Sequence, residues 1–301
     1  MNSASSPAPS LQLTGNKFLG YLCGLGFITV WTGFIVVSRL GVKGDLTPYD
    51  ITALRFMVGS LVTLPFVYLY WPRHLPLGKI LILAATGPGT IYSVLMYIGL
   101  EHSPAAFAGV FANGSIPIFT AMFAWVLLGD RLSSNAFFAI AVILTGSIAV
   151  GYEAMHVAGS SNLSGLPFLI ASSFVLAAYM VFIRMWKVTA KQTLAIINLP
   201  NTLIFLPVWY FMLPSGLASA GIGEIMLQAL YQGLGPGFMA LIFFTYAIQA
   251  LGATPVAGFA ATVPATAALL AIPVLGETLN FIEWVGVLTV TLGLALLLLR
   301  R

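Results

Sequence analysis

Charged residues are scarce in this sequence, and their scarcity excludes an ordinary soluble domain. Asp, Glu, Lys and Arg make up only 7% of the 301 residues. A soluble domain carries about 25% charged residues because its surface faces water. Hydrophobic residues make up 59% of the chain, which indicates that most of its surface faces lipid.

Cysteine and histidine are also rare, and no acid lies deep in an apolar run. The single Cys23 lies inside an apolar run and cannot form an intrachain disulfide, so it indicates a small packing residue. The three histidines and eight acids lie at or beyond the ends of the apolar runs. An intramembrane enzyme would need a nucleophile and base, or a pair of acids, at depth. We therefore expect no catalytic residue, no metal site and no cofactor.

Basic residues are few and dispersed, although the formal net charge is +4. They form no run or patch, so they indicate membrane topology rather than binding to nucleic acid.

Long apolar runs fill the rest of the chain and predict an all-α integral membrane protein. A spanning helix needs about 20 apolar residues. Residues 1–16 are polar and rich in Ser and Pro, and we expect a disordered tail there. The runs that follow predict ten transmembrane helices, at about 18–38, 50–70, 80–100, 105–128, 135–152, 163–186, 192–212, 227–250, 255–275 and 281–299.

The distribution of Lys and Arg at the helix ends predicts the orientation of the protein. On the side opposite the N-terminus lie only Arg39, Lys43 and Arg55. We therefore expect a multi-pass protein of the cell (inner) membrane with both termini in the cytoplasm. The basic residues on the N-terminal side are Lys17, Arg73, Lys79, Arg131, Arg184, Lys187, Lys191, Arg300 and Arg301.

The second half of the sequence repeats the first. Because each predicted half contains five spans, an odd number, the halves enter the membrane from opposite sides. Such inverted repeats are typical of transporters that alternate between two openings, whereas a receptor or structural scaffold does not need them. The motifs recur in the same order, at offsets of 142 to 148 residues: Leu64-Pro65 and Leu206-Pro207, Gly87-Pro88-Gly89 and Gly235-Pro236-Gly237, Ser115-Ile116-Pro117 and Thr262-Val263-Pro264, Gly129-Asp130-Arg131-Leu132 and Gly276-Glu277-Thr278-Leu279, Gly146 and Gly293.

These features resemble the EamA family of the drug/metabolite transporter superfamily. The resemblance rests on two five-helix repeats, here 17–152 and 163–301, each with a Leu-Gly-Asp/Glu-x-Leu motif closing its fourth helix after a mid-helix proline. Asp130 stands where glutamate is commoner in this family. Three further motifs are similar to YddG-type exporters of aromatic and other amino acids: Trp31, Asn113-x3-Pro117 and Ala177-Ala178-Tyr179.

The resemblance implies an exporter of small metabolites, above all amino acids, working by alternating access. Relatives that exchange protons for cationic drugs use a membrane-buried carboxylate, and no predicted span has one at its centre. Arg55 lies about one turn inside its helix, where we expect it to snorkel outward or pair with Asp50. An uncharged or zwitterionic solute fits this pattern best. Drugs, nucleosides and sugar-type metabolites remain alternatives, because the superfamily carries many solutes.

Candidate binding residues come from polar and aromatic positions deep in the spans. Pro117 and Pro264 each remove a backbone hydrogen bond near a helix centre, releasing the carbonyls of Asn113 and Ala260. Nearby polar side chains either line a cavity or only join helices. The binding residues that we predict are Trp31, Tyr92, Asn113, Ser115, Tyr179, Phe244 and Thr262.

Candidate hinges come from the prolines and glycines repeated inside the spans, which bend helices or allow close packing. The partners that we expect are a small-molecule substrate and the lipid bilayer, with no nucleic acid. Either a monomer or a homodimer agrees with the sequence. The hinge residues that we predict are Gly87, Pro88, Gly89, Pro117, Gly235, Pro236, Gly237 and Pro264.

Overall fold

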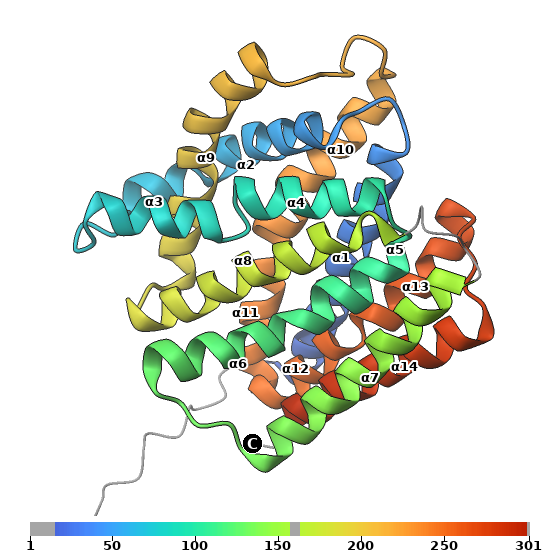
Figure 1. The fold of residues 1–301 in the computed structure, drawn as a ribbon. Helices are drawn as coiled ribbons and strands as arrows, with labels where there is room; N and C mark the ends of the chain where they lie inside the picture. Colours follow the sequence, from blue (N-terminus) through green and yellow to red (C-terminus); the bar gives the residue numbers. More distant parts are fainter. Residues whose placement is uncertain (1–15, 157–162, 300–301) are drawn as a thin grey trace, which may run out of the picture.

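The fold of the described residues is entirely helical. The computed structural model describes residues 16–156 and 163–299 (Figure 1). The tail expected over residues 1–16 lies outside the described residues except for Asn16. The first half contains α1 (Lys17–Val42), α2 (Pro48–Tyr70), α3 (Leu77–Thr86), α4 (Thr90–Glu101), α5 (Ala105–Phe107), the π-helix η1 (Ala108–Asn113), α6 (Gly114–Leu128) and α7 (Ser134–His156).

The second half follows the same plan. Over the described residues, eight segments are long and apolar enough to cross a membrane. The remaining two spans are the pair α12 and α13, interrupted at Thr262, and α14, so the expected ten spans are confirmed. The elements are α8 (Leu166–Met185), α9 (Ala190–Met212), α10 (Ile222–Leu234), the π-helix η3 (Gly235–Met239), α11 (Ala240–Leu251), α12 (Ala253–Ala261), α13 (Val263–Leu275) and α14 (Phe281–Leu299).

Equivalent helices of the two halves begin and end with the same local chemistry. Thr47 starts α2 with a capping box to Asp50, and Thr189 starts α9 with a capping box to Gln192, 142 residues later. Gly129 and Gly276 end α6 and α13 with φ of 70° and 65°. A left-handed residue at this position is most easily a glycine. The glycine of the repeated Leu-Gly-Asp/Glu motif is therefore a helix terminator.

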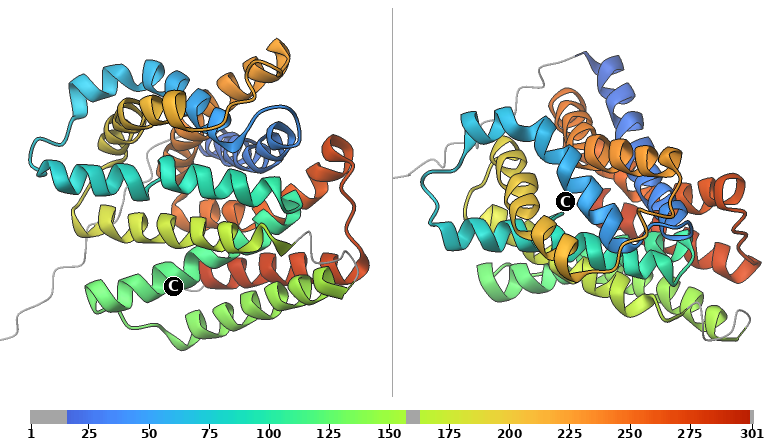
Figure 2. Two further views of the ribbon diagram at one scale, coloured as in Figure 1. Left: turned by 45° about the horizontal axis from the view of Figure 1, so that its top comes forward. Right: turned by 90° about the horizontal axis from the view of Figure 1, so that it is seen from above.

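Equivalent helices also pack against each other across the two halves. The pair α2 and α9 lies at one edge of the bundle, and α7 and α14 lie side by side at the other (Figures 1 and 2). The hydroxyls of Ser60 and Thr202 are 2.5 Å apart in the first pair. In the second pair, a Cβ on Gly146 would lie 2.7 Å from the carbonyl oxygen of Gly286, so only glycine allows this approach.

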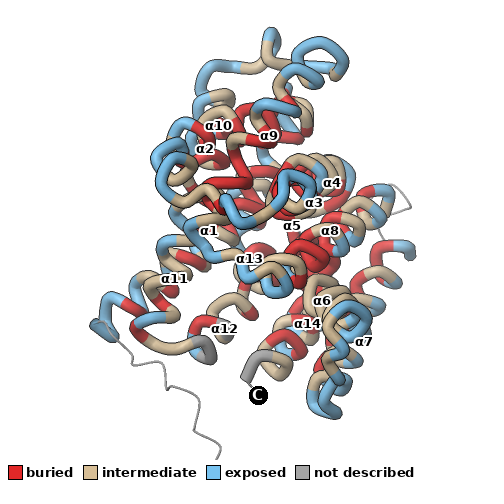
Figure 3. Tube along the Cα trace, turned by 90° about the vertical axis from the view of Figure 1, so that its left-hand side faces the viewer, coloured by how far each residue is buried: buried red, intermediate tan, exposed pale blue. Residues whose placement is uncertain are grey.

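Burial follows the requirements of a protein surrounded by lipid. The buried residues run through the middle of the bundle, and exposed positions face outward (Figure 3). Large apolar side chains are exposed on that outer surface, for example Leu61 at 74% and Phe137 at 71%. Such a surface would aggregate in water, where exposed apolar patches are normally small. It is the surface that lipid chains require.

Candidate functional site

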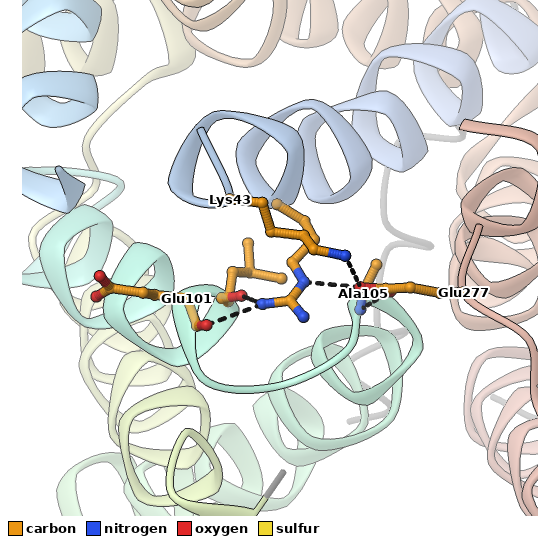
Figure 4. A network of polar contacts seen from close by, with 6 residues as sticks. Lys43, Glu101, Ala105 and Glu277 are labelled. Atoms are coloured by element: carbon orange, nitrogen blue, oxygen red, sulfur yellow. Dashed lines mark hydrogen bonds and ion pairs between the residues drawn. The ribbon is translucent and has the colours of Figure 1, made fainter. Parts of the chain in front are cut away.

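An ion-pair cluster ties the two halves together at the end of the bundle where α1 finishes, here named the distal end. Arg39 Nε donates to Glu277 Oε1 at 2.8 Å, and Lys43 Nζ lies 3.7 Å from the same oxygen. The other carboxylate oxygen accepts from the Ala105 amide at 2.8 Å. Arg39 Nη1 also donates to the carbonyls of Leu100 and Glu101 (Figure 4). We call these six residues the distal clamp.

A second ion pair lies at the opposite, proximal end of the bundle. Arg184 Nη1, near the end of α8, lies 2.5 Å from Asp130 Oδ2, just beyond the end of α6. The two side chains are 62% and 42% exposed, whereas those of Arg39 and Glu277 are 12% and 13% exposed. Exposed ion pairs are screened by water and are worth less than buried ones with additional hydrogen bonds. The proximal pair is therefore the weaker of the two.

The two ion pairs are equivalent under the inverted repeat. Asp130 and Glu277 follow the fourth spans of their halves at the same position of the repeated motif. Arg39 and Arg184 lie near the ends of the first spans of their halves. Each acid binds the arginine of the opposite half, so each pair joins the repeats at one end of the bundle. Both pairs are formed in this conformer.

The third span is broken at Gly87-Pro88-Gly89. Asn201 of α9 spans the break: its Nδ2 donates to the Ala84 carbonyl at 2.9 Å. Its Oδ1 accepts from the amide and the hydroxyl of Thr90, at 2.9 and 2.7 Å. The Ala84 carbonyl is the one that Pro88 deprives of its helical partner. A side chain at Gly89 would collide with that carbonyl, so the glycine is required.

The equivalent Gly235-Pro236-Gly237 segment differs, because it forms the π-helix η3 rather than a break. The fourth and ninth spans show the opposite arrangement: the fourth contains the π-helix η1, and the ninth is interrupted at Thr262. The irregular segments of these two spans approach closely, since a Cβ on Gly109 would lie 2.9 Å from Pro264 Cα. π-Helices of this kind are frequent at functional sites. Each of these two pairs of equivalent spans thus has one break and one π-helix.

The polar binding residues predicted from the sequence lie at these irregular segments. Asn113 is the last residue of η1, and its Nδ2 is buried without a hydrogen-bond partner. Ser115 follows two residues later and is partly buried. Thr262 donates its hydroxyl to the carbonyl of Phe259, one helical turn earlier, at 2.7 Å. Of the three, Asn113 has a buried side-chain donor that lacks a hydrogen-bond partner.

Two of the predicted aromatic residues belong to one continuous row of rings. Trp31 lies between Phe27 and Phe34, with ring centroids 5.9 and 6.0 Å away. Phe244 of α11 lies 5.0 Å from Phe27, and Tyr97 of α4 lies 6.1 Å from Phe34. We call these five residues the aromatic row. It runs from α11 along α1 to α4.

The other predicted aromatic residues lie outside this row. Tyr92 is buried on α4. Tyr179 of α8 donates its hydroxyl to Thr193 at 3.0 Å, and its ring packs beside Gly87 at the break. Among the described residues, no hydrogen bond or ring contact joins Asn113 to Trp31 or Tyr179. The polar residues among those predicted lie on the fourth and ninth spans, and the aromatic ones lie on α1, α4, α8 and α11.

Arg55 does not behave as the sequence suggests, and the expectation that it snorkels or pairs with Asp50 is wrong. Its side chain is directed into the bundle, where the residue is only 3% exposed. Asp50 instead accepts hydrogen bonds from Trp209 Nε1 at 2.9 Å and the Ser215 hydroxyl at 2.6 Å, besides the Gly216 amide at 2.8 Å. Because the Asp50 carboxylate is bound by α9 and by the loop before α10, it forms no ion pair with Arg55.

Sequence reasoning also missed several buried amides. Asn198 donates to the Thr63 hydroxyl at 3.3 Å, and Asn201 holds the broken third span. Gln228 and Gln232 lie one turn apart on α10, and their side chains share a hydrogen bond of 3.1 Å. Polar residues spaced three or four apart inside an apolar run would have indicated a shared, inward-facing side of the helix.

The buried acids lie near the distal end rather than at the centre of a span. Asp50, Glu153 and Glu283 are at most 9% exposed. Glu153 accepts from the Asn280 side chain at 3.0 Å, and Glu283 accepts from the Asn280 amide at 2.9 Å. Glu153 lies near the end of α7, and the other two lie in the first turns of α2 and α14. Each of them has hydrogen-bond partners at its helix end.

The fold and the two ion pairs define a class of protein: a membrane transporter built from two inverted repeats of five helices. The sequence profile of the EamA-like transporter family matches residues 18–152 and 163–299. The chain therefore belongs to the EamA-like transporter family, which is a family of transporters and not of enzymes.

Relatives from all three domains of life support this membership. An uncharacterised transporter of Archaeoglobus fulgidus is 24% identical over 85% of this chain and 89% of its own length. Solute carrier family 35 member G1 of mouse is 30% identical, over 75% of this chain and 65% of its own. An uncharacterised Synechocystis transporter is also 30% identical, over 74% and 68%. One solved crystal structure matches with a TM-score of 0.62 and 19% identity, over 93% of this chain and 96% of the other, which supports the fold alone.

Proposed function

We propose that this protein exports small metabolites, above all neutral and aromatic amino acids, across the inner membrane by alternating access. The observation that carries the mechanism is the pair of equivalent ion pairs, Arg39–Glu277 and Asp130–Arg184, at opposite ends of the bundle. A transporter of this kind must open one end while the other stays closed. Ion pairs between the repeats at both ends can serve as the two gates.

The chemistry of the interior favours an amphipathic solute. The aromatic row, with Trp31 and Phe244 as predicted wall residues, offers apolar surface to a side chain. Asn113 offers a buried amide donor without a partner. Leaving such a group unsatisfied costs about 1–3 kcal/mol, which a substrate oxygen would offset. We assign secondary roles in binding to Ser115 and Thr262 beside it, and to Tyr92 and Tyr179 on α4 and α8.

The proposed orientation places both termini in the cytoplasm. The distal clamp then faces the outside, and the pair of Asp130 and Arg184 faces the cytoplasm. This assignment is supported by the excess of basic residues at the proximal helix ends, since positively charged loops are retained in the cytoplasm. Export requires the proximal end to open first, and the weaker, more exposed ion pair lies there.

Flux through reconstituted vesicles tests the proposed substrate class. Purified protein in proteoliposomes is loaded with a mixture of unlabelled amino acids, nucleosides and sugars, and solute exchange is followed by mass spectrometry. We expect exchange of neutral and aromatic amino acids well above that of empty liposomes. Exchange of nucleosides or sugars without amino acids would assign the protein to another class of substrates. The distal and proximal gates would remain to be tested separately.

A further inference from the structure

Arg55 is a buried cation surrounded by neutral groups. It lies on α2 about 10 Å from the distal end of that helix, at 1.5 Å per residue. Nη1 lies 3.4 Å from the Tyr97 hydroxyl, and Nη2 lies 3.4 Å from the Pro88 carbonyl oxygen. The guanidinium carbon lies 5.4 Å from the centre of the Phe34 ring. Both hydrogen bonds are long, and they leave the cation incompletely satisfied.

Two polar groups at this site lack hydrogen-bond partners. Arg55 Nε is buried and has no hydrogen-bond partner. The Ser93 hydroxyl, one helical turn before Tyr97 on α4, is buried and also lacks a partner. Polar groups in a protein interior are almost always hydrogen-bonded, so unsatisfied donors indicate a strained or functional site. Here the orphaned donors share the neighbourhood of a full positive charge.

No acid neutralises this charge in the part of the chain that the structure describes. The ion pairs of at most 4.0 Å there involve Arg39, Lys43 and Arg184, but not Arg55. The groups packed around Arg55 from α1, α4 and α10 are neutral. Tyr97 donates to Gln232 Oε1 at 3.1 Å, and Gln232 Nε2 donates to the Ser38 hydroxyl at 3.0 Å. An uncompensated charge at this depth is costly, and charges inside membrane proteins normally mark substrate or ion pathways.

We propose that the Arg55 guanidinium is the anion-binding residue of the transport pathway and binds the carboxylate of an amino-acid substrate. This assignment rests on the proposed function and extends it by naming the partner of the substrate's negative end. A guanidinium binds a carboxylate through two parallel hydrogen bonds, which Nε and one Nη nitrogen would provide. The aromatic row ends at Tyr97 and includes Phe34, so the apolar part of the same solute lies against rings that already contact Arg55.

The distal clamp lies immediately beside this site. Arg39 follows Ser38 on α1, and it binds the carbonyl of Leu100, one turn after Tyr97 on α4. Releasing Arg39 from Glu277 and from α4 would let α1 and α4 separate where they enclose Arg55. The Pro88 carbonyl, which Nη2 contacts, belongs to the break in the third span. A carboxylate that competes for the guanidinium would therefore also loosen a contact at the predicted hinge.

Binding of solutes that differ only in the carboxylate tests the assignment. The purified protein is titrated with L-phenylalanine, L-phenylalaninamide and 3-phenylpropanoate by isothermal calorimetry. The wild type should bind phenylalanine about ten- to hundredfold more tightly than the amide, the range expected for a hydrogen bond to a charged group. 3-Phenylpropanoate should compete with phenylalanine. In Arg55→Gln both effects should vanish while affinity for the amide is kept, and Arg55→Lys should restore part of the preference.

Stability separates a binding role from a structural one. Removing an uncompensated buried charge relieves a desolvation penalty, so ligand-free Arg55→Gln should melt at the same or a higher temperature than the wild type. A full preference for the carboxylate in Arg55→Gln, or loss of folding in both variants, would overturn the assignment. If the wild type neither binds nor carries any amino acid, the proposed function itself fails. If it carries them and Arg55→Gln does so equally well, only the role of Arg55 is wrong.

Discussion

Glu277 closes the distal end of the bundle by binding Arg39 at 2.8 Å, and Asp130, its equivalent 147 residues earlier, binds Arg184 at the proximal end. Each repeat thus supplies the acid of one ion pair and the arginine of the other, at opposite ends of the bundle. An exchange of conformations between the repeats would exchange the strengths of the two pairs. The present conformer has the distal pair buried and the proximal pair exposed, so the two ends are unequal at rest.

Neutralising one acid should shift the conformational equilibrium in a direction set by the end it closes. Glu277→Gln should favour the distal-open state by about 1.5–3 kcal/mol, the worth of a hydrogen bond to a charged group, or ten- to hundredfold in population. Asp130→Asn should shift it the other way by only about 0.2–1 kcal/mol, because its ion pair is exposed. A reporter cysteine at Ser38, in a Cys23→Ala background, measures the state through its rate of labelling.

The labelling rate of that cysteine should rise in Glu277→Gln and stay constant or fall in Asp130→Asn. A cysteine in the exposed loop after α2 serves as the matched control and should react equally in all variants. Equal labelling of the Ser38 cysteine in the wild type and in both variants would show that the ion pairs do not control opening of the two ends.

The Gly-Pro-Gly segments should affect the rate of transport more than the affinity for substrate. Pro88→Ala restores a backbone N–H and so allows α3 and α4 to join into one helix. Pro236→Ala likewise restores the N–H whose absence disturbs the helix at η3. Both variants therefore alter helix bending rather than contacts with the substrate. Single-turnover exchange and equilibrium binding, measured side by side, check this. Rates equal to the wild type in both variants would show that the segments only pack helices.

Asn113 should contribute to affinity without contributing to folding. Its Nδ2 has no partner in the ligand-free protein, so Asn113→Ala removes no hydrogen bond of that atom. Losing one hydrogen bond to a charged end of the solute should cost about 1.5–3 kcal/mol. The half-saturation concentration for amino-acid exchange should then rise about ten- to hundredfold.

A second variant gives the comparison for Asn113. Trp31→Ala should weaken transport of amino acids with large side chains more than small ones, because it removes a ring of the aromatic row. Unchanged concentration dependence in Asn113→Ala, at normal membrane insertion, would mean that the Asn113 side chain does not bind the solute.

The proposed orientation predicts labelling from one side of the membrane. Cysteines introduced beside Arg73 and beside Lys187, in the loops after α2 and α8, should react with an impermeant reagent only in inside-out vesicles. A cysteine beside Gly221, in the loop before α10, is the opposite control and should react in intact cells. Labelling of the first two from outside intact cells would reverse the assigned topology.

The sequence predicted the spans and the repeat well because both depend on local chemistry. Apolar length determines which segments cross a membrane. Gly129 and Gly276 mark helix ends because the left-handed backbone conformation there favours glycine. The motif that Asp130 and Glu277 share was visible as a repeat. Their arginine partners were not, because each pair joins residues from opposite halves of the chain.

Arg55 shows where sequence reasoning stops. Its distance from Asp50 along α2 suggested an ion pair, but Trp209 of α9 and Ser215 in the loop before α10 bind that carboxylate instead. Likewise, the equivalent Gly-Pro-Gly segments fold differently: Asn201 binds both sides of the first, and the second forms a π-helix. Partners from distant segments decide these outcomes, and a single sequence does not reveal which distant segments meet.

Reversible cross-linking of the two ends tests the central claim most directly. In a Cys23→Ala background, one variant carries cysteines at positions 39 and 277, and another at positions 130 and 184. A short bifunctional thiol reagent with a reducible link joins each pair, and single-cysteine variants control for modification alone. If the gates alternate, amino-acid exchange in proteoliposomes should stop when either pair is cross-linked and return after reduction. Continued exchange with either end fully cross-linked would contradict alternating access between these two ion pairs.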